Sequence, residues 1–280
     1  MSDLPDRRRL FALAYRMLGS RAEAEDVLQD AWLRWQGVSD VRSPSAWLTT
    51  TVTRLCLDQL KSARLERETY VGPWLPEPIA THEPELDAES VSLAFLAVLE
   101  RLTPAERAVF LLHDVFDYSH AEIAETLGLG EANVRKLRQR AKEHLALEKP
   151  RFAPTKERHA EILLSFAAAC QNGELSPLRA LLAEHARAYT DGGGKARAAR
   201  KVVFGRDRVA RLLHGLGRKG GAEGIEAELS VLNGWPALIL RRSSGVFGVL
   251  AIETDGHEVF SVHLVLNPDK LGSLAGEAPS

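Results

Sequence analysis

Six polar side chains that can bind nucleic acid gather on one predicted helix near the middle of the chain. They are Arg135, Lys136, Arg138, Gln139, Arg140 and Lys142. Guanidinium, ammonium and carboxamide groups donate hydrogen bonds to base edges and to phosphate oxygens. On the same stretch Val134, Leu137, Ala141 and Leu145 recur every three or four residues, which predicts an apolar face that packs on the protein. The opposite face then presents the donors to DNA.

The segment before this helix predicts how it is positioned. Ser119 and Glu122 have the spacing of a capping box, and an apolar stripe follows until Gly128 ends the helix. Two helices joined by the short turn at 128–130, with the second one basic, predict a helix-turn-helix. The alternative is an ordinary helical hairpin with a solvated basic face. The coincidence of cap, glycine turn and clustered basic residues favours DNA binding.

A second set of residues could do proton chemistry. Asp191, His257 and His263 would act as acid and base if they converged in an apolar cavity. The plainer interpretation is that His257 is exposed after a turn and that His263 is a structural residue of a strand. Cys56 and Cys170 lack metal-ligand spacing and are expected to be buried. We therefore predict no enzyme, no metal site and no cofactor.

Composition narrows the class of protein. The 280 residues are 45% hydrophobic, enough for two or three domains, and carry a formal net charge of −2. No apolar run reaches the roughly 20 residues of a membrane span, and no signal-peptide pattern opens the chain. We expect a cytoplasmic protein. Because affinity for DNA rests largely on phosphate neutralisation, its DNA binding should be local or assisted.

The N-terminal third predicts three helices, over 6–18, from Ser20 to Gly37, and from 43–45 to about 67. The apolar faces include the tryptophans Trp32, Trp35 and Trp47, which we expect in the core. The second helix has a polar face with Asp26, Gln29 and Asp30; it is either a solvated surface or a docking face for a basic partner. The third is basic towards its end.

The middle of the chain predicts a linker and more helices. Four prolines and several acids between 71 and 90 indicate a linker without helical period. Helix is predicted again over 91–102. A capping box at Thr103 to Glu106 then introduces an apolar helix over 108–116.

Beyond a hinge at 148–155 the pattern changes to α+β. Helices are predicted over 157–170, 176–184 and 206–216, and strand-like segments lie among and after them. Turns at Asn233-Gly234 and at 255–256 separate the last strands, which predicts a curved antiparallel sheet.

The order of these parts resembles the extracytoplasmic-function sigma factors of bacterial RNA polymerase. LFALAYRMLGSRAEAEDVLQDAWLRW and SPSAWLTTTVTRLCLDQLKSARL are similar to their region-two domain, and LTPAERAVFLLHDVFDYSHAEIAETLGLGEANVRKLRQRAKEHL to region four. The helices and strands at the end resemble the cone-shaped SnoaL-like fold. The resemblance implies a multidomain fold: an all-α region-two domain (1–72), an acidic linker (73–90), an all-α helix-turn-helix region-four domain (91–147), a hinge (148–155), an α+β SnoaL-like domain (156–271) and a tail (272–280).

Three further stretches resemble signatures of the SigJ-like group of these sigma factors, which carry such a fused domain. They are Trp74-Leu75-Pro76-Glu77-Pro78, Asp191-Gly192-Gly193-Gly194-Lys195 and Asn267-Pro268-Asp269-Lys270-Leu271. Each alone is a turn, a flexible loop or a stiff linker segment. Together they predict an interdomain regulatory interface, in which Lys195 and Lys270 would meet the acids of the linker.

The resemblance implies a sigma factor that directs core polymerase to promoters and is regulated by its own C-terminal domain. In the basic helix, Arg135, Lys136, Gln139 and Arg140 would read the bases of the −35 element, and Arg138 and Lys142 would lie nearer its phosphates. The −10 element would be contacted by Arg54, Lys61 and Arg64, and the polymerase would be bound through Asp26, Gln29 and Asp30. The implied partners are the β and β′ subunits of polymerase and promoter DNA, with a small molecule in the SnoaL-like pocket as a further option, no membrane, and a monomer when free. The alternatives are a helix-turn-helix regulator that senses a ligand, and a sigma-like protein whose SnoaL-like domain retains enzymatic activity.

Overall fold

The chain folds into two compact units in the computed structural model, which describes residues 4–38, 41–80, 92–146, 154–171 and 174–274. The first unit holds the described residues up to Thr69 and those from Leu96 to 146. The second holds Tyr70 to Ala80, residues 92–95 and all described residues from 154 onward. The segment from Tyr70 to Ala80, predicted as the start of a linker, therefore clusters with the C-terminal residues.

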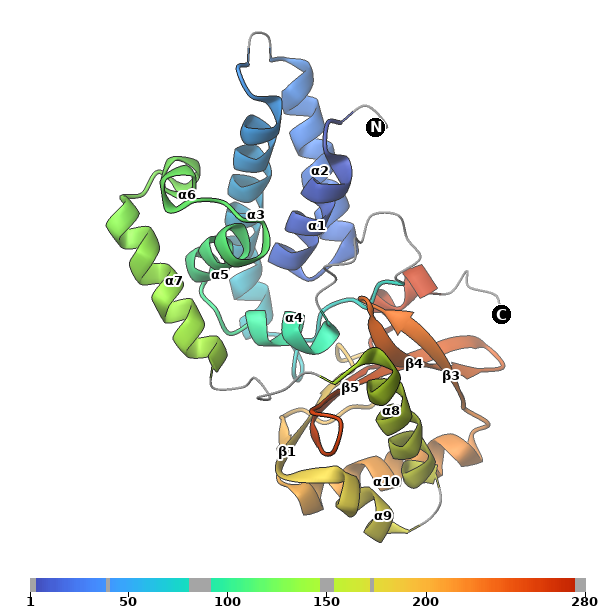
Figure 1. The fold of residues 1–280 in the computed structure, drawn as a ribbon. Helices are drawn as coiled ribbons and strands as arrows, with labels where there is room; N and C mark the ends of the chain where they lie inside the picture. Colours follow the sequence, from blue (N-terminus) through green and yellow to red (C-terminus); the bar gives the residue numbers. More distant parts are fainter. Residues whose placement is uncertain (1–3, 39–40, 81–91, 147–153, 172–173, 275–280) are drawn as a thin grey trace. The chain divides into compact units, whose positions relative to one another are not determined.

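The first unit is helical (Figure 1). Its elements are α1 (Arg7–Leu18), α2 (Arg21–Gln36), α3 (Pro44–Glu68), α5 (Pro104–Phe110), a π-helical turn (Leu111–Val115), α6 (His120–Leu127) and α7 (Glu131–Ala146). The residues of α4 (Leu93–Leu99) are divided between the two units. The α1–α2–α3 core buries Phe11, Met17, Leu28, Leu48 and Val52 almost completely. The three N-terminal helices predicted from the apolar periodicity are confirmed.

Side-chain caps begin several of these helices as the sequence predicts. Thr103 accepts a hydrogen bond from the Glu106 backbone N–H, and the Glu106 carboxylate accepts one from the Thr103 N–H in return. Ser20 accepts from the Glu23 N–H at the start of α2. These bonds satisfy donors that the first helical turn leaves without partners.

The apolar helix predicted over 108–116 is not one regular α-helix. It ends at Phe110 and continues as a π-helical turn, in which the Phe116 N–H bonds to the Leu111 carbonyl at 3.0 Å. A π turn accommodates an extra residue and shifts the direction of the side chains that follow. Asp114 lies within this turn.

The second unit is an α+β domain with a six-stranded sheet. Its elements are α8 (Lys156–Gln171), α9 (Leu175–Leu181), β1 (Leu182–Asp191), β2 (Val203–Phe204), α10 (Arg206–Ala222), β3 (Glu226–Leu232), β4 (Trp235–Arg242), β5 (Gly245–Thr254) and β6 (Val259–Val265), followed by 3₁₀ turns over Pro268–Lys270 and Gly272–Leu274. The strand order is β2-β1-β6-β5-β4-β3. Strands β3 to β6 pair antiparallel, as predicted, while β1 lies parallel to β6.

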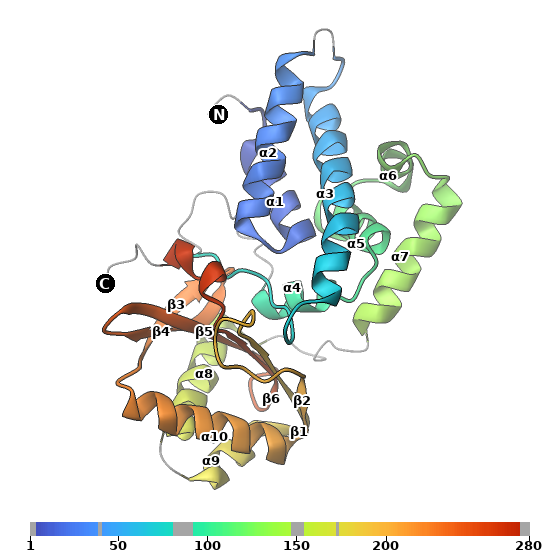
Figure 2. The same ribbon diagram turned by 180° about the vertical axis from the view of Figure 1, so that it is seen from behind.

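Two helices and the sheet form the core of this unit. Phe166 of α8 and Leu213 of α10 share one apolar cluster with Leu238, Ile252 and Val262 of the strands. Figures 1 and 2 show α8 and α10 packed beside the sheet. The helices and curved sheet predicted for the C-terminal domain are therefore confirmed.

Two predicted helix ends in this unit are wrong. The helix over 176–184 stops at Leu181, because Leu182 becomes extended and pairs with Val259 of β6. The helix predicted over 206–216 continues to Ala222 through three more glycines, at positions 217, 220 and 221. One of these glycines, Gly217, is required by packing: a Cβ there would lie 2.4 Å from the Cys170 carbonyl oxygen of α8.

Three further expectations from the sequence concern the burial of the two cysteines, a metal site and a membrane-spanning helix. Cys56 and Cys170 are both buried, as predicted. No cluster of residues suited to hold a metal ion occurs in the part of the chain that the structure describes. Within that same part, no helix has the length and apolar character needed to cross a bilayer.

Candidate nucleic-acid interface and linker-binding site

The helix-turn-helix forms as the sequence predicts. Ser119 and Glu122 close a reciprocal capping box at the start of α6, and Gly128 ends the helix with φ of 66°. In α7, Val134, Ala141 and Leu145 are buried against the unit. The four residues expected to read bases are exposed on the other face: Arg135, Lys136, Gln139 and Arg140.

The two residues expected to contact phosphates have a protein partner in this structure. Arg138 donates two hydrogen bonds of 2.8 Å to the Asp114 carboxylate, and Lys142 lies 2.9 Å from the same group. Partial burial acts to raise the Asp114 pKa, but the bonds and charges of Arg138 and Lys142 outweigh it and lower the pKa to about 2. The π turn places Asp114 here, which the sequence did not reveal.

Helix α3 packs against α6 within the first unit. The Thr49 and Tyr118 hydroxyl groups are 3.0 Å apart, and the Nε of Arg54 donates to the Thr126 carbonyl at 3.0 Å. Arg107, buried, donates to the Met17 carbonyl at 2.7 Å and so ties α5 to α1. Arg54, predicted to contact −10 DNA, is exposed, and its Nε is bonded to a carbonyl of the same unit in this structure.

The other residues of the first unit that were predicted to bind DNA or polymerase, or to lie in the core, are at least partly exposed or lie outside the described residues. Lys61 is exposed and pairs with Asp58 at 3.0 Å. The side chain of Arg64 lies outside the described residues. Asp26, Gln29 and Asp30 are all exposed on α2. Trp32, Trp35 and Trp47 are half-buried, and the rings of Trp35 and Trp47 are 5.6 Å apart.

In the second unit, the three signature stretches meet at one buried carboxylate, Asp191. Its Oδ1 accepts hydrogen bonds from the Tyr70 hydroxyl at 2.6 Å and the Gly193 N–H at 3.0 Å. Its Oδ2 accepts from the Leu75 N–H at 2.9 Å and the Lys270 ammonium at 2.7 Å. Asp191 is fully buried. We call residues 70–80 the linker segment and this cluster the Asp191 site.

Lys270 holds the linker segment from the other side. Its ammonium group donates to the Leu75 carbonyl oxygen and lies 3.9 Å from the centre of the Trp74 ring. Its side chain is only 11% exposed. A shielded cation over an indole ring gains more than an exposed one, since water no longer screens the attraction. Both polar backbone groups of Leu75 are thus bound by charged side chains of the C-terminal domain.

Asn267 and the glycine loop complete the site. The Asn267 amide donates to the Tyr70 hydroxyl at 3.0 Å, and Tyr70 in turn donates to Asp191. Burial, followed by the bond to Asp191, raises the Tyr70 pKa above its usual value. Gly193 has φ of 58°, and a Cβ there would lie 2.3 Å from the Asn267 amide nitrogen. Glycine is therefore required sterically as well as conformationally.

A second contact holds the C-terminal end of the linker segment. The Asn233 side chain accepts from the Ile79 N–H at 3.2 Å, and the Asn233 N–H donates to the Ile79 carbonyl at 2.8 Å. Ala80 forms a β-bridge with Leu232. Leu75, Ile79 and Ala80 are each at most 1% exposed. The segment is buried as part of the domain rather than laid on its surface.

The two signature lysines bind a buried carboxylate, a backbone carbonyl and a surface acid of their own domain, and their pairing with linker acids stays a prediction. Lys270 binds Asp191 and a carbonyl oxygen, and Lys195 pairs at 2.6 Å with Asp269 on the surface. Lys270 reaches both the carbonyl oxygen and the buried carboxylate because the 3₁₀ turn at 268–270 directs its side chain inward. The linker acids at positions 83, 85, 87 and 89 lie outside the described residues. Of the other signature residues, Pro76, Glu77, Pro78 and Leu271 are buried, while Pro268 and Gly194 are exposed.

The proposed acid–base set does not line the cavity of this domain. Register pairs Tyr189 with His263 and Thr190 with Leu264, so Asp191 and His263 project from the sheet face opposite to Thr190. Thr190 and Leu264 line the cavity of this domain, and Asp191, His257 and His263 do not. His263 bonds to Ser261 at 2.8 Å, and His257 is exposed. Both histidines match the plainer interpretation.

Two residues of the site were missed from sequence. The sequence analysis assigns no role to Tyr70, which lies shortly before the first signature stretch. Asn233 was assigned to a hairpin turn, and its positive φ of 53° fits that turn. Its side chain also binds the linker segment, a role that the local pattern does not encode.

Comparison with known proteins agrees with this geometry. Residues 6–66 match the family model "Sigma-70 region 2", and residues 92–145 match "Sigma-70, region 4". The ECF RNA polymerase sigma factor SigJ of Mycobacterium tuberculosis is 37% identical over 94% of this chain and 90% of its own length. The probable ECF sigma factor SigI of the same species is 32% identical over 96% of this chain and 93% of its own.

A solved structure extends the likeness to the fold. The crystal structure of M. tuberculosis SigJ matches with a TM-score of 0.78 and 34% sequence identity, covering 95% of this chain and 96% of that one. Both sigma regions and the C-terminal domain are included in that coverage. The chain therefore belongs to the extracytoplasmic-function RNA polymerase sigma factors, in the SigJ-like group, and it is a transcription initiation factor.

Proposed function

We propose that the C-terminal domain regulates this sigma factor by holding the linker segment in the Asp191 site. The observation that carries the proposal is the convergence of four donors, from Tyr70, Leu75, Gly193 and Lys270, on one buried carboxylate. Two of these donors belong to the stretch that connects the sigma regions. Binding of this stretch shortens the connection available to regions two and four and so opposes their spreading over core polymerase.

The energetic logic is that of a two-state switch. Removing one partner from a buried ion pair leaves an uncompensated charge and costs about 3–5 kcal/mol. The linker segment is thus either fully bound or released, with few partly bonded states between. A state that releases it would favour the extended arrangement that polymerase binds. Loosening should change activity and leave promoter choice unaltered.

Reporter transcription in cells with a defined cognate promoter tests this proposal. Trp74→Ala removes the ring over Lys270 and Asp191→Asn removes the charge, so both should alter transcription several-fold. Lys195→Ala breaks only an exposed pair and should not. Truncation at residue 155 should change regulation but preserve the promoter sequences used. Wild-type activity in both site variants, at equal protein levels, would contradict the proposal.

We further propose that α7 reads the −35 element, with Arg135 and Arg140 on base edges. Their exposure on one helix face, opposite the buried Val134 and Ala141, supports this role. Each bidentate contact to guanine is worth about 1–3 kcal/mol of discrimination. Arg135→Ala or Arg140→Ala should relax specificity at single −35 positions in holoenzyme binding assays. Equal losses on all promoter variants would refute the assignment.

The polymerase and −10 contacts are proposed from exposure and charge. Asp26, Gln29 and Asp30 present an acidic α2 face to a basic surface of the β or β′ subunit. Arg54, Lys61 and Arg64 would hold the −10 strand, and the Arg54 bond to Thr126 implies that α3 and α6 must separate first. Charge reversal at Asp26 and Asp30 should weaken holoenzyme assembly. Assembly at wild-type affinity would exclude this face.

A further inference from the structure

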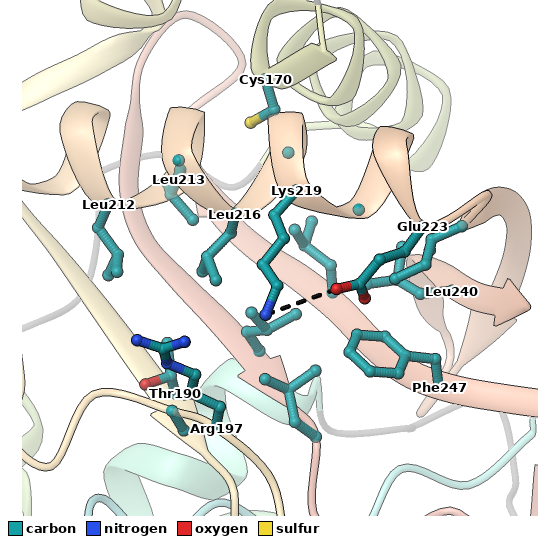
Figure 3. A pocket seen from close by; sticks show the side chains of 18 of the residues that line it. Cys170, Thr190, Arg197, Leu212, Leu213, Leu216, Lys219, Glu223, Leu240 and Phe247 are labelled. Carbon is teal, nitrogen blue, oxygen red and sulfur yellow. Dashed lines mark ion pairs between the residues drawn. The ribbon is translucent and has the colours of Figure 1, made fainter.

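The second unit contains a cavity of about 870 Å³ that is separate from the Asp191 site. Helix α10, the sheet and the segment after the glycine loop enclose it. Figure 3 shows Leu212, Leu216 and Lys219 of α10 pointing into the cavity, with Thr190 and Arg197 on the facing wall and Phe247 at its side. The volume lies within the range of small-molecule sites, about 300–1,000 Å³.

The charge of the lining is strongly one-sided. Five basic residues line the cavity, Lys195, Arg197, Arg211, Lys219 and Arg242, against one acid, Glu223. Lys219 pairs with Glu223 at 3.5 Å, Lys195 pairs with Asp269, and the Arg242 guanidinium lies 5.2 Å from the Phe247 ring. Among the described residues, no ion pair engages Arg197 or Arg211.

The rest of the lining is apolar. The cavity is lined by five buried leucines and by the half-buried Leu240; the buried ones are Leu213, Leu238, Leu250, Leu264 and Leu266. An apolar floor with guanidinium groups at its edge suits a molecule with a hydrophobic body and a single anionic head. Arg binds carboxylates and phosphates through two parallel hydrogen bonds to a pair of oxygens, which favours either kind of head.

We propose that this cavity binds an amphipathic anion, a long acyl or comparable apolar body with a carboxylate or phosphate head held by Arg197 and Arg211. Cys170 also lines the cavity but takes no chemical part, because burial raises its pKa to about 12 and keeps the thiol protonated. The site is one of binding, since the candidate acid and bases project elsewhere.

The cavity wall is continuous with the Asp191 site. Lys195 and residues 196–199 line the cavity and directly follow the glycine loop, and Thr190 beside Asp191 lines it too. The Thr190 hydroxyl accepts from the Ala199 N–H at 2.8 Å and so joins the two walls. An occupant that favours one position of this wall would shift the equilibrium of linker binding. This second step rests on the proposed regulatory function; binding itself does not.

Calorimetric titration of the full chain with dodecanoate, below its micellar concentration, tests binding directly. Dodecanol and dodecyltrimethylammonium serve as neutral and cationic probes of equal chain length, and dodecyl phosphate distinguishes the two kinds of head. We expect one site per chain, with dodecanoate or dodecyl phosphate bound at least tenfold more tightly than dodecanol. Similar affinities for anion and alcohol, or many weak sites, would overturn the proposal.

Matched variants locate the site. Arg197→Gln with Arg211→Gln should weaken anion binding about tenfold or more and leave dodecanol unaffected. Arg208→Gln with Arg218→Gln removes the same charge from exposed positions of α10 outside the cavity and should change nothing. Leu216→Trp, with folding checked by circular dichroism, should reduce binding of all probes. If both double variants behaved alike, the anion would be bound elsewhere.

A separate readout addresses coupling. Hydrogen exchange of the linker segment should change on saturation with the preferred anion in the wild type. If binding occurred without any change there, the cavity would stand as a binding site, the link to the linker segment would be refuted, and the proposed regulatory function would remain for its own test.

Discussion

Replacement of Asp191 by alanine is the sharpest test of the Asp191 site. Lys270, whose side chain is only 11% exposed, would lose its carboxylate partner. The Tyr70 hydroxyl and the Leu75 N–H would each lose a hydrogen-bond acceptor. Breaking a buried pair costs about 3–5 kcal/mol, and the lower end applies because Lys270 keeps the Leu75 carbonyl and the Trp74 ring. A loss of about 3 kcal/mol corresponds to roughly a 100-fold rise in opening.

Hydrogen exchange measured by mass spectrometry on the 70–80 peptide reads this opening. In the regime where reclosing outpaces exchange, the rate at Leu75 follows the free energy of local opening. We expect on the order of 100-fold faster exchange in Asp191→Ala and less than about fivefold in Lys195→Ala, whose pair with Asp269 is exposed. Equal acceleration in the two variants, or unchanged exchange in Asp191→Ala, would refute the assignment of Asp191 as the centre of the site.

Four further predictions follow from particular contacts. Gly193→Ala should destabilise the linker contact by about 1–3 kcal/mol more than Gly194→Ala in the same exchange assay, since both have positive φ but only the Cβ at 193 meets Asn267. Burial lowers the pKa of His159, so the unfolded state binds the proton more readily than the folded state. The stability of the second unit should therefore fall as the pH drops from 6.5 towards the folded-state pKa. His159→Phe should make stability less dependent on pH over this range in thermal melts. Asp114→Asn removes the charge that engages Arg138 and Lys142. It should therefore steepen the salt dependence of holoenzyme binding to DNA by about one phosphate contact or more. An unchanged salt dependence would show that these two residues do not contact phosphates. The purified chain should bind promoter DNA specifically only with core polymerase, as mobility shifts at physiological salt can check; specific binding by the chain alone would contradict the expectation from its net charge of −2.

Local sequence determined much of the helical half of this protein. Caps at Ser119 and Thr103, the stop at Gly128 and the apolar spacing of α7 act within one or two turns, so each can be read from neighbouring residues. The exposed basic face of α7 follows from the same spacing, since burying Val134 and Ala141 directs Arg135 and Arg140 outward. The helix-turn-helix was therefore predictable in its elements and in its candidate surface.

Tertiary structure alone decided what the polar residues bind. Asp114 reaches Arg138 and Lys142 through a π turn, a departure of one residue that periodicity does not reveal. Lys270 lies 195 residues from Leu75 in sequence, and its bonds to the Leu75 carbonyl oxygen and to Asp191 depend on how the 3₁₀ turn at 268–270 meets β1. Neighbouring side chains alternate along β1, so Asp191 and Thr190 point to opposite faces, but the placement of β1 beside β6 decides that one face meets the linker segment and the other the cavity. Such long-range register is set by the packing of the whole domain, which no local pattern contains.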